Sequence, residues 1–104
     1  MLPKRRRLTS SEVTEVLRTG RSRRATHLTM RFLAKNTPLK TSAVVAKSVA
    51  KHAVDRNRLR RAVYKALTPL SGTGNAVVFV QKIPKDNQTH VFTADITTLF
   101  TNNR

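Results

Sequence analysis

The clearest hydrophobic pattern lies between Ala53 and Leu67, where apolar residues recur three or four positions apart. At about 100° per residue these side chains share one face of a helix. They are Leu59, Ala62, Val63, Ala66 and Leu67. The pattern predicts an amphipathic helix over 53–67. It ends at Thr68 and Pro69, because proline disfavours helical geometry in the residue before it.

The chain before this helix predicts one more helix and two strands. Thr9 and Glu12 have the spacing of a capping box, and Gly20 suits a helix end, so we expect a helix over about 10–19. From Ala25 the period becomes two, which indicates a half-buried strand. Its apolar face is Leu28, Met30 and Phe32, and its polar face is His27, Thr29 and Arg31.

The segments around this first strand are predicted from their residue types. Arg21 to Arg24 form a basic cluster that we expect in a loop, and Asn36 to Pro38 favour a turn. Ser42 to Ala46, rich in valine and alanine, predict a second strand.

The last third of the chain predicts a strand and a helix. Ser71 to Asn75 form a glycine-containing loop, and Ala76 to Val80 read as a buried strand that ends before Ile83 and Pro84. Apolar residues at helical spacing predict a final helix over 90–101; they are Phe92, Ile96, Leu99 and Phe100. The predicted order α-β-β-α-β-α corresponds to an α+β fold, an α-β sandwich with helices packed on a small sheet.

Charge gives the first indication of function. The chain has 104 residues with 21 Lys and Arg against 5 Asp and Glu, a formal net charge of +16. All but three of these cations fall within residues 1–71; the exceptions are Lys82, Lys85 and Arg104. Such an excess predicts a nucleic-acid partner. We expect residues 1–104 to form a single RNA-binding domain, with residues 1–7 as a mobile basic arm.

The cations of the 53–67 helix flank its apolar face on both sides. Arg58, Arg61 and Lys65 fall on one flank, whereas Arg56, Arg60 and Tyr64 fall on the other. Only Asp55 lies close enough to balance them, so the arginines are not expected to be used up in ion pairs within the helix. Arginine suits bidentate contacts to phosphate.

Residues for independent catalysis are not apparent. The five acids are scattered singly, and His27, His52 and His90 show no metal-ligand spacing. The chain has no cysteine, which excludes disulfides, thiolate zinc sites and cysteine nucleophiles. Gly72 to Gly74 lack the Gly-Lys-Ser/Thr ending of a phosphate-binding loop. The basic start is not followed by an apolar segment, and a cytoplasmic protein is expected.

The run from Val45 to Arg61 resembles the signature of the bacterial ribonuclease P protein component, and Arg56-Asn57-Arg58 followed by Leu59-Arg60-Arg61 is its most specific part. The resemblance implies an α-β sandwich with an extra short strand and a left-handed β-α-β crossover. It also implies a subunit of a ribonucleoprotein that removes the 5′ leader of precursor tRNA. In that family the RNA performs the cleavage with magnesium, which the RNA mainly holds, and the protein is an accessory subunit that binds the catalytic RNA and the leader.

The resemblance also carries over candidate residues by position. Those for RNA binding are Lys47, Lys51, Arg56, Asn57, Arg58, Arg60 and Arg61, to which the helix pattern adds Lys65 on the same flank. The candidates for leader binding do not come from the match: His27, Thr29 and Arg31 form the polar face of the first strand, and Tyr64, Val13 and Leu17 are positions at which this chain differs from the family. No catalytic or metal-binding residue is expected in the protein itself.

This chain departs from the family pattern at several positions. Ser48 replaces a common lysine, and Val13 and Leu17 stand where phenylalanine is frequent. Tyr64 replaces an arginine and is interpreted as a stacking contact to a base.

The alternative function is a ribosomal or other structural RNA-binding protein with no role in cleavage, since composition alone does not separate the two. The Arg-Asn-Arg element and the residues before it favour ribonuclease P. The expected partners are therefore the catalytic RNA and precursor tRNA, with no membrane and no obligate protein partner.

Overall fold

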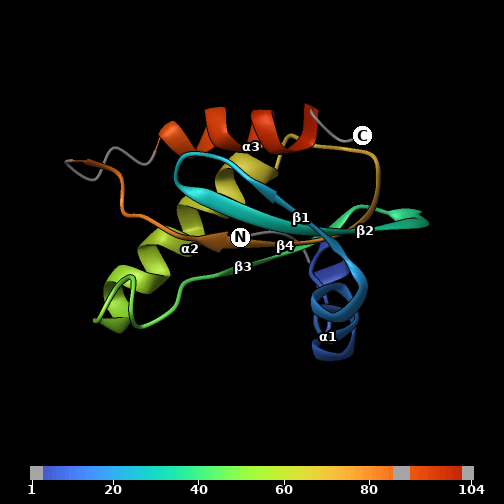
Figure 1. The fold of residues 1–104 in the computed structure, drawn as a ribbon, viewed down its shortest axis with the longest axis horizontal. Coiled ribbons are helices and arrows are strands. Elements are labelled where there is room, and N and C mark those ends of the chain that lie inside the picture. The colour runs from blue at the N-terminus through green and yellow to red at the C-terminus, as the bar shows by residue number, and fades with distance from the viewer. Residues whose placement is uncertain (1–3, 86–89, 102–104) are drawn as a thin grey trace.

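The computed structural model describes residues 4–85 and 90–101. Its elements are η1 (Lys4–Arg6), α1 (Ser10–Thr19), β1 (Arg21–Arg24), β2 (Leu28–Pro38), β3 (Lys40–Val44), α2 (Ala53–Leu67), β4 (Thr73–Val80) and α3 (Val91–Thr101). The strands form one mixed sheet in the order β1-β2-β4-β3. In Figure 1, α3 and most of α2 lie on one side of this sheet and α1 lies on the other. The predicted α+β sandwich is confirmed.

The sheet combines antiparallel and parallel pairing. β2 pairs antiparallel with both β1 and β4, whereas β3 pairs parallel with β4. The β3-α2-β4 segment is therefore a crossover between adjacent parallel strands, as the resemblance implies. The hand of that crossover stays a prediction.

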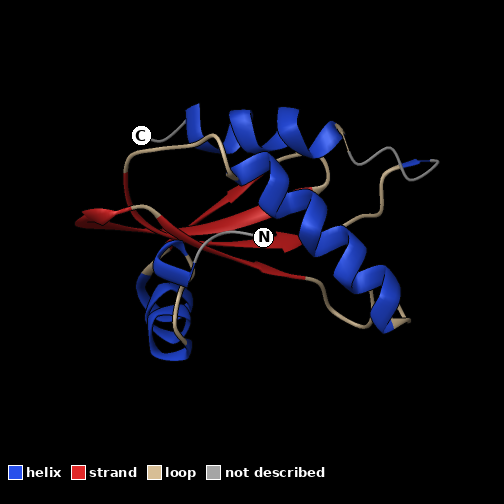
Figure 2. Cartoon of the chain, turned by 180° about the vertical axis from the view of Figure 1, so that it is seen from behind, coloured by secondary structure: helices blue, strands red, loops and turns tan. Residues whose placement is uncertain are grey.

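The core lies between the sheet and the two helices α2 and α3, which Figure 2 shows on the same side of the strands. Leu28 and Met30 of β2 point into it and are fully buried, as the alternation predicted. Of the five predicted stripe residues of α2, four are each no more than 7% exposed, namely Leu59, Val63, Ala66 and Leu67, and Ala62 is partly buried against them. Phe92, Ile96 and Leu99 complete the core from α3.

Helix α1 packs on the opposite face of the sheet, and local contacts fix its position. The capping box forms as predicted: the Glu12 amide donates to the Thr9 hydroxyl, and the Thr9 amide donates to the Glu12 carboxylate. The hydrogen bond from the Thr9 amide is the main reason that the pKa of Glu12 lies below its usual value, and the Lys40 ammonium lowers it further. Glu12–Lys40 and Glu15–Lys35 ion pairs tie the helix to the strands beneath it.

Three predictions of local structure are wrong. Arg21 to Arg24 form an edge strand rather than a loop, because their backbone pairs with residues 29–32 of β2. The turn at Asn36 to Pro38 is part of β2, and the chain reverses at Leu39 instead. The second strand ends at Val44, two residues before the predicted Ala46.

Residues 4–7 of the predicted basic arm lie against the rest of the fold, whereas residues 1–3 lie outside the described part, and the mobility of the arm stays a prediction. Arg6 donates to the carbonyls of Thr68 and Leu70, at 3.0 and 2.8 Å. Arg7 forms an isolated parallel bridge with Thr41 of β3, and the Leu8 amide donates to the Thr41 carbonyl. These contacts hold the segment against β3 and the C-terminal end of α2.

Gly74 in β4 is required by close packing. Its φ is +113°, and a Cβ at this position would lie 2.6 Å from the ring of Phe32. Any other residue would meet both the backbone penalty and this ring. A loop was predicted over Ser71 to Asn75, but β4 begins at Thr73, so the last three of these residues are part of the strand.

Candidate RNA-binding surface

The first part of α2 extends past the sheet with its side chains in solvent. No residue from Ala53 to Arg58 is buried, and Val54 is 78% exposed. The yellow-green end of the helix in Figure 1 lies beyond the strands. Asn57, Arg58, Arg61 and Lys65 are exposed, while Arg56 and Arg60 are partly buried. The Arg-Asn-Arg element is therefore displayed as a basic projection, which we call the α2 projection (residues 53–61).

The loop before α2 is held against this projection by Arg56. Its Nη1 donates to the carbonyl oxygens of Ala50 and Lys51, at 3.0 and 2.9 Å. Ala50 is itself buried, at 4% exposed, so the loop is anchored at its C-terminal end. Lys47 and Lys51 are exposed on this loop. Arg56 therefore positions two further predicted RNA-binding cations beside the helix.

Two arginines of the projection have polar partners within the helix, contrary to the prediction. Arg58 forms a 3.2 Å ion pair with Asp55, and Arg60 donates to the side-chain oxygen of Asn57. Both partners lie three residues earlier in the helix. Exposed pairs of this kind contribute little stability, about 0–1 kcal/mol, so a phosphate can displace them. They orient the guanidinium groups without removing them from solvent.

Tyr64 does not line the exposed flank, so this prediction is wrong. Its side chain is only 7% exposed, and its hydroxyl accepts the Ala43 amide of β3 at 3.1 Å. The phenol is long enough to reach around the helix to the sheet edge. Its ring belongs to the core and leaves no face for a base.

The sheet face that carries α1 is only partly covered. Val77 of β4 lies beneath α1 with Val16, and both are fully buried. Two residues further along the strand, on the same face, Thr29 of β2 pairs with Phe79 of β4, and both are partly exposed. Their neighbours in the adjacent strands extend this row across the sheet as Arg24, Thr29, Phe79 and Val44. We call this row the open strip.

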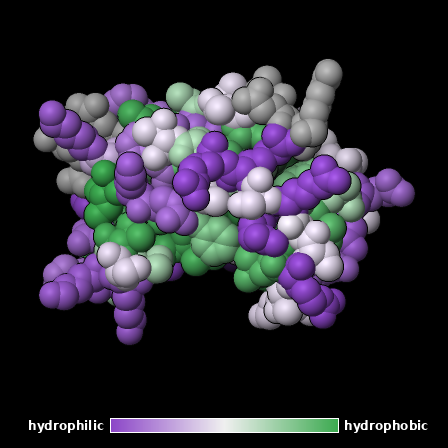
Figure 3. Space-filling model, viewed as in Figure 1, coloured by the Kyte–Doolittle hydropathy of each residue, from purple (hydrophilic) through white to green (hydrophobic). Residues whose placement is uncertain are grey.

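A cavity of about 360 Å³ adjoins the open strip. It is lined by Arg24, Ala25, Thr26, Thr29, Gln81 and Lys82. Two cations, two hydroxyls and an amide thus lie beside the partly exposed ring of Phe79. Figure 3 shows an apolar patch in the middle of the molecule, over β3 and β4, with hydrophilic side chains around it. Apolar surface framed by cations is typical of sites for single-stranded nucleic acid.

The predicted leader-binding residues divide between the two faces of the sheet. Thr29 belongs to the open strip, and Leu17 of α1 is 40% exposed. Val13 is partly exposed on the same helix. Arg31 follows Thr29 on this face, but its Nη2 donates to the Gly20 carbonyl at 2.9 Å, which fixes it at the end of α1.

His27 points elsewhere, so the prediction that it shares a face with Thr29 is wrong. Its Nδ1 lies 3.3 Å from the Asp95 carboxylate, and its backbone amide donates to the same oxygen at 2.8 Å. Its ring also packs edge-on against Phe92 of α3. Residues 25–27 form no strand, so the alternation does not extend to position 27.

Sequence reasoning missed Phe79, Arg24 and Lys82. Phe79 lies in a continuous apolar run, where no alternation marks which side chains are covered. Arg24 was assigned to a loop, so its place beside Thr29 in the sheet was not anticipated. Pairing residues 21–24 with the polar face of β2 would have placed Arg24 beside Thr29, whereas no signal in the sequence marks Phe79 or Lys82.

The described acids are all used in structural contacts. Glu12 and Glu15 pair with lysines, Asp55 with Arg58, and Asp95 with His27. Asp86 lies outside the described residues. Within residues 4–85 and 90–101, no cluster of three His, Asp or Glu could hold a metal ion. The donor set in this part of the chain does not fit a protein-held magnesium ion. Among the same residues, no helix has the length and apolar character to cross a membrane.

The comparisons with known proteins agree in family and in fold. The family model described as Ribonuclease P matches residues 2–103. A Staphylococcus aureus RNase P protein structure at 2.0 Å is 15% identical with a TM-score of 0.78, covering 92% of this chain and 93% of that chain. Another structure of the S. aureus protein is 17% identical with a TM-score of 0.71, covering 97% and 91%.

A third solved structure is an S. aureus RNase P protein mutant described as having defective mRNA degradation activity. It is 15% identical with a TM-score of 0.80 and covers 94% of this chain and 87% of that chain. At these identities the structures show a shared fold. No curated protein sequence gives a significant match.

Proposed function

Since the chain belongs to the ribonuclease P family and is a protein subunit of ribonuclease P, we propose that it acts as an accessory subunit of an RNA catalyst in the 5′ maturation of tRNA. The RNA cleaves the phosphodiester bond and holds the magnesium ions. The protein contributes binding to the catalytic RNA and to the leader of precursor tRNA. We expect it to act in the cytoplasm without an obligate protein partner.

The observation that carries this proposal is the contrast between the cations and the acids. The α2 projection presents exposed arginines to solvent, whereas each described carboxylate already contacts a basic side chain. Cleavage by the protein would need free carboxylates for metal ions or a general acid and base. Exposed guanidinium groups suit phosphate binding instead.

We propose a division of labour between the two surfaces. The α2 projection, with Lys47, Lys51 and Lys65 beside it, binds the catalytic RNA. The open strip binds the leader, because single-stranded RNA offers unstacked bases to Phe79 and phosphates to Arg24 and Lys82. Val13 and Leu17 of α1 give the leader an apolar wall in place of the phenylalanines that are frequent in the family.

The test is reconstitution with the ribonuclease P RNA of the same source at low magnesium concentration. We expect the protein to stimulate cleavage of precursor tRNA strongly over RNA alone. A substrate with a leader of one nucleotide should be stimulated much less than one with a long leader. If the protein binds the RNA but gives no stimulation with either substrate, a structural RNA-binding role replaces the proposal.

The open strip has its own variant. Phe79→Ala should reduce the stimulation on the long-leader substrate and leave that on the short-leader substrate unchanged. Lys85→Ala, an exposed cation outside the cavity, is the matched control. Equal losses on both substrates would show that Phe79 does not contact the leader.

A further inference from the structure

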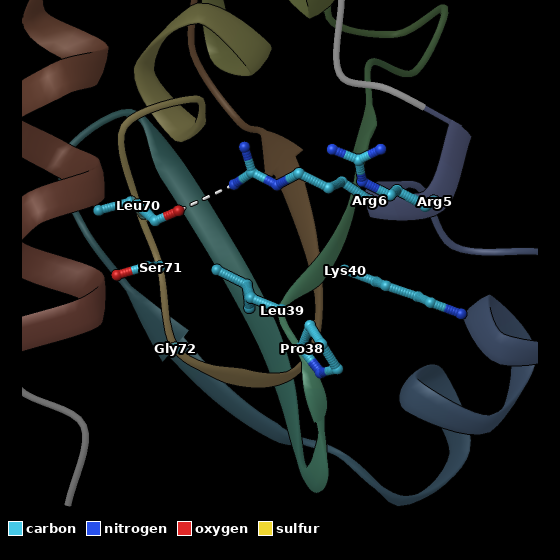
Figure 4. Close-up of a pocket in the computed structure, with 8 residues that line it drawn as sticks. All are labelled: Arg5, Arg6, Pro38, Leu39, Lys40, Leu70, Ser71 and Gly72. Atoms are coloured by element: carbon cyan, nitrogen blue, oxygen red, sulfur yellow. Dashed lines mark hydrogen bonds between the residues drawn. The ribbon is translucent and has the colours of Figure 1, made fainter.

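A second cavity lies at the other end of α2, away from the α2 projection. Figure 4 shows it between η1, the β2–β3 junction and the segment that follows α2. Its volume is about 450 Å³, within the range of about 300–1,000 Å³ typical of small-molecule sites. It is lined by Arg5, Arg6, Pro38, Leu39, Lys40, Leu70, Ser71 and Gly72. None of these residues belongs to the surfaces described above.

One wall of the cavity is apolar and fixed. Pro38 and Leu39 point into the space in Figure 4, whereas Leu70 turns its carbonyl toward Arg6 and packs its side chain against the core. The Leu39 amide donates to the Gly72 carbonyl at 3.0 Å, which joins the two chain segments beneath the cavity. Leu39 is only 5% exposed, so its backbone and side chain are held by packing. The wall is therefore formed before any ligand arrives.

Arg6 crosses the cavity with its guanidinium already held. Nη1 donates to the Thr68 carbonyl and Nη2 donates to the Leu70 carbonyl, so both terminal nitrogens form hydrogen bonds along the edge of the guanidinium plane. Figure 4 shows the bond to Leu70 and the side chain extended above Leu39. A guanidinium held by its edges keeps its planar faces for stacking, and arginine planes stack on nucleobases.

Arg5 supplies a cation at the rim. It is exposed, and no hydrogen bond or ion pair engages it within the described residues. Lys40 lines the same cavity but is neutralised by Glu12 at 3.1 Å. Ser71 is exposed at the edge of the cavity next to Leu70, and its hydroxyl points away from Leu39 in Figure 4, so it reaches a ligand at the rim and not at the wall. The cavity thus combines an apolar wall, a planar cation, a hydroxyl and a free guanidinium.

We propose that this cavity binds one unpaired nucleotide of the ribonuclease P RNA. The base enters between Leu39 and Arg6, the phosphate meets Arg5, and Ser71 bonds the ribose 2′-hydroxyl or the base edge. This inference rests on the proposed function, which supplies the RNA. The RNA then contacts the protein at both ends of α2, about 22 Å apart for its 15 residues.

Because the chain contains no cysteine, a single one can carry a crosslinking group to the cavity. Ser71→Cys is labelled with a benzophenone maleimide, mixed with ribonuclease P RNA or with precursor tRNA alone, and irradiated. Val54→Cys, 78% exposed on the α2 projection, reports the main RNA contact. Thr97→Cys, exposed on α3, is the matched negative control.

The expected result is a crosslink from position 71 to one unpaired nucleotide of the ribonuclease P RNA. Arg5→Ala in the Ser71→Cys background should reduce its yield, and Ser71→Trp should weaken affinity for that RNA about tenfold, as for one lost stacked base. A crosslink from position 54 with none from 71 overturns the cavity and leaves the proposed function intact. A crosslink from 71 to precursor tRNA alone also overturns it, and no crosslink from either position contradicts both.

Discussion

From Leu59 to Leu67, α2 places most of its apolar side chains in the core, whereas from Ala53 to Arg58 it buries none. The two halves have continuous helical backbone, but all five residues of the hydrophobic stripe lie in the C-terminal half. Only the C-terminal half touches the sheet and α3. The comparison shows how a small domain can display a helix end: packing of one half holds the helix, and the other half contributes contacts only to the adjacent loop, through Arg56.

The largest expected effect is on the packed half. Leu67 is fully buried, so Leu67→Ala should lower the free energy of unfolding by about 2–5 kcal/mol. Urea unfolding followed by circular dichroism measures it. Val54→Ala, on the exposed half, is the control and should change stability by no more than about 0.5 kcal/mol. Similar losses of unfolding free energy in both variants would show that the two halves of α2 contribute equally to stability.

Arg56 tests whether any residue of the exposed half contributes to the stability of the fold. Arg56→Ala removes two hydrogen bonds to loop carbonyls, and should cost about 1–2 kcal/mol of stability, since hydrogen bonds to charged groups are stronger than neutral ones. RNA affinity should also fall, because Lys47 and Lys51 lose their fixed position. If stability is unchanged in urea unfolding while affinity falls, Arg56 acts on RNA alone.

Tyr64 packs into the core and contacts β3, although the helical pattern placed it on an exposed flank of the helix. Tyr64→Phe removes the acceptor of the Ala43 amide and should cost about 1 kcal/mol. The Ala43 amide should also exchange hydrogen faster, which NMR measures directly. Unaltered exchange at Ala43 would contradict the contact.

Arg61 should show the smallest effect on folding. It is exposed, so Arg61→Ala should leave the free energy of unfolding within about 0.5 kcal/mol of the parent. Its effect belongs to binding: the slope of log affinity against log salt should fall by about one unit for one lost phosphate contact. Filter binding with the ribonuclease P RNA at several salt concentrations gives the slope. Lys85→Ala should leave it unchanged, and an unchanged slope for Arg61→Ala would place this residue outside the RNA contact.

The sequence predicted the bounds of α1 and α2 well because each has a strong local cause. Thr9 and Glu12 define the start of one helix, and Pro69 the end of the other. The edge strand β1 has no such cause: four polar residues, three of them arginine, give no alternation, and only pairing with β2 makes them a strand. Local sequence therefore does not predict an element, such as β1, that forms only by pairing with a distant segment.

The candidate site divides in the same way. The cations of α2 that are predicted to bind RNA follow from the helix itself, and they are exposed or partly exposed as predicted. Tyr64 and His27 do not, because each is drawn away by a distant partner, Ala43 for one and Asp95 for the other. Phe79 was missed for the converse reason, since its exposure depends on where α1 stops covering the sheet.

The contacts along the outer side of β3 also bear on aggregation. An edge strand offers free backbone groups to which another chain can add. Here the Thr41 carbonyl accepts the Leu8 amide, and the Ala43 amide is taken by the Tyr64 hydroxyl. At the opposite edge, β1 carries three arginines, which repel a second copy. The sheet therefore resists strand-to-strand association between copies of the protein at both edges.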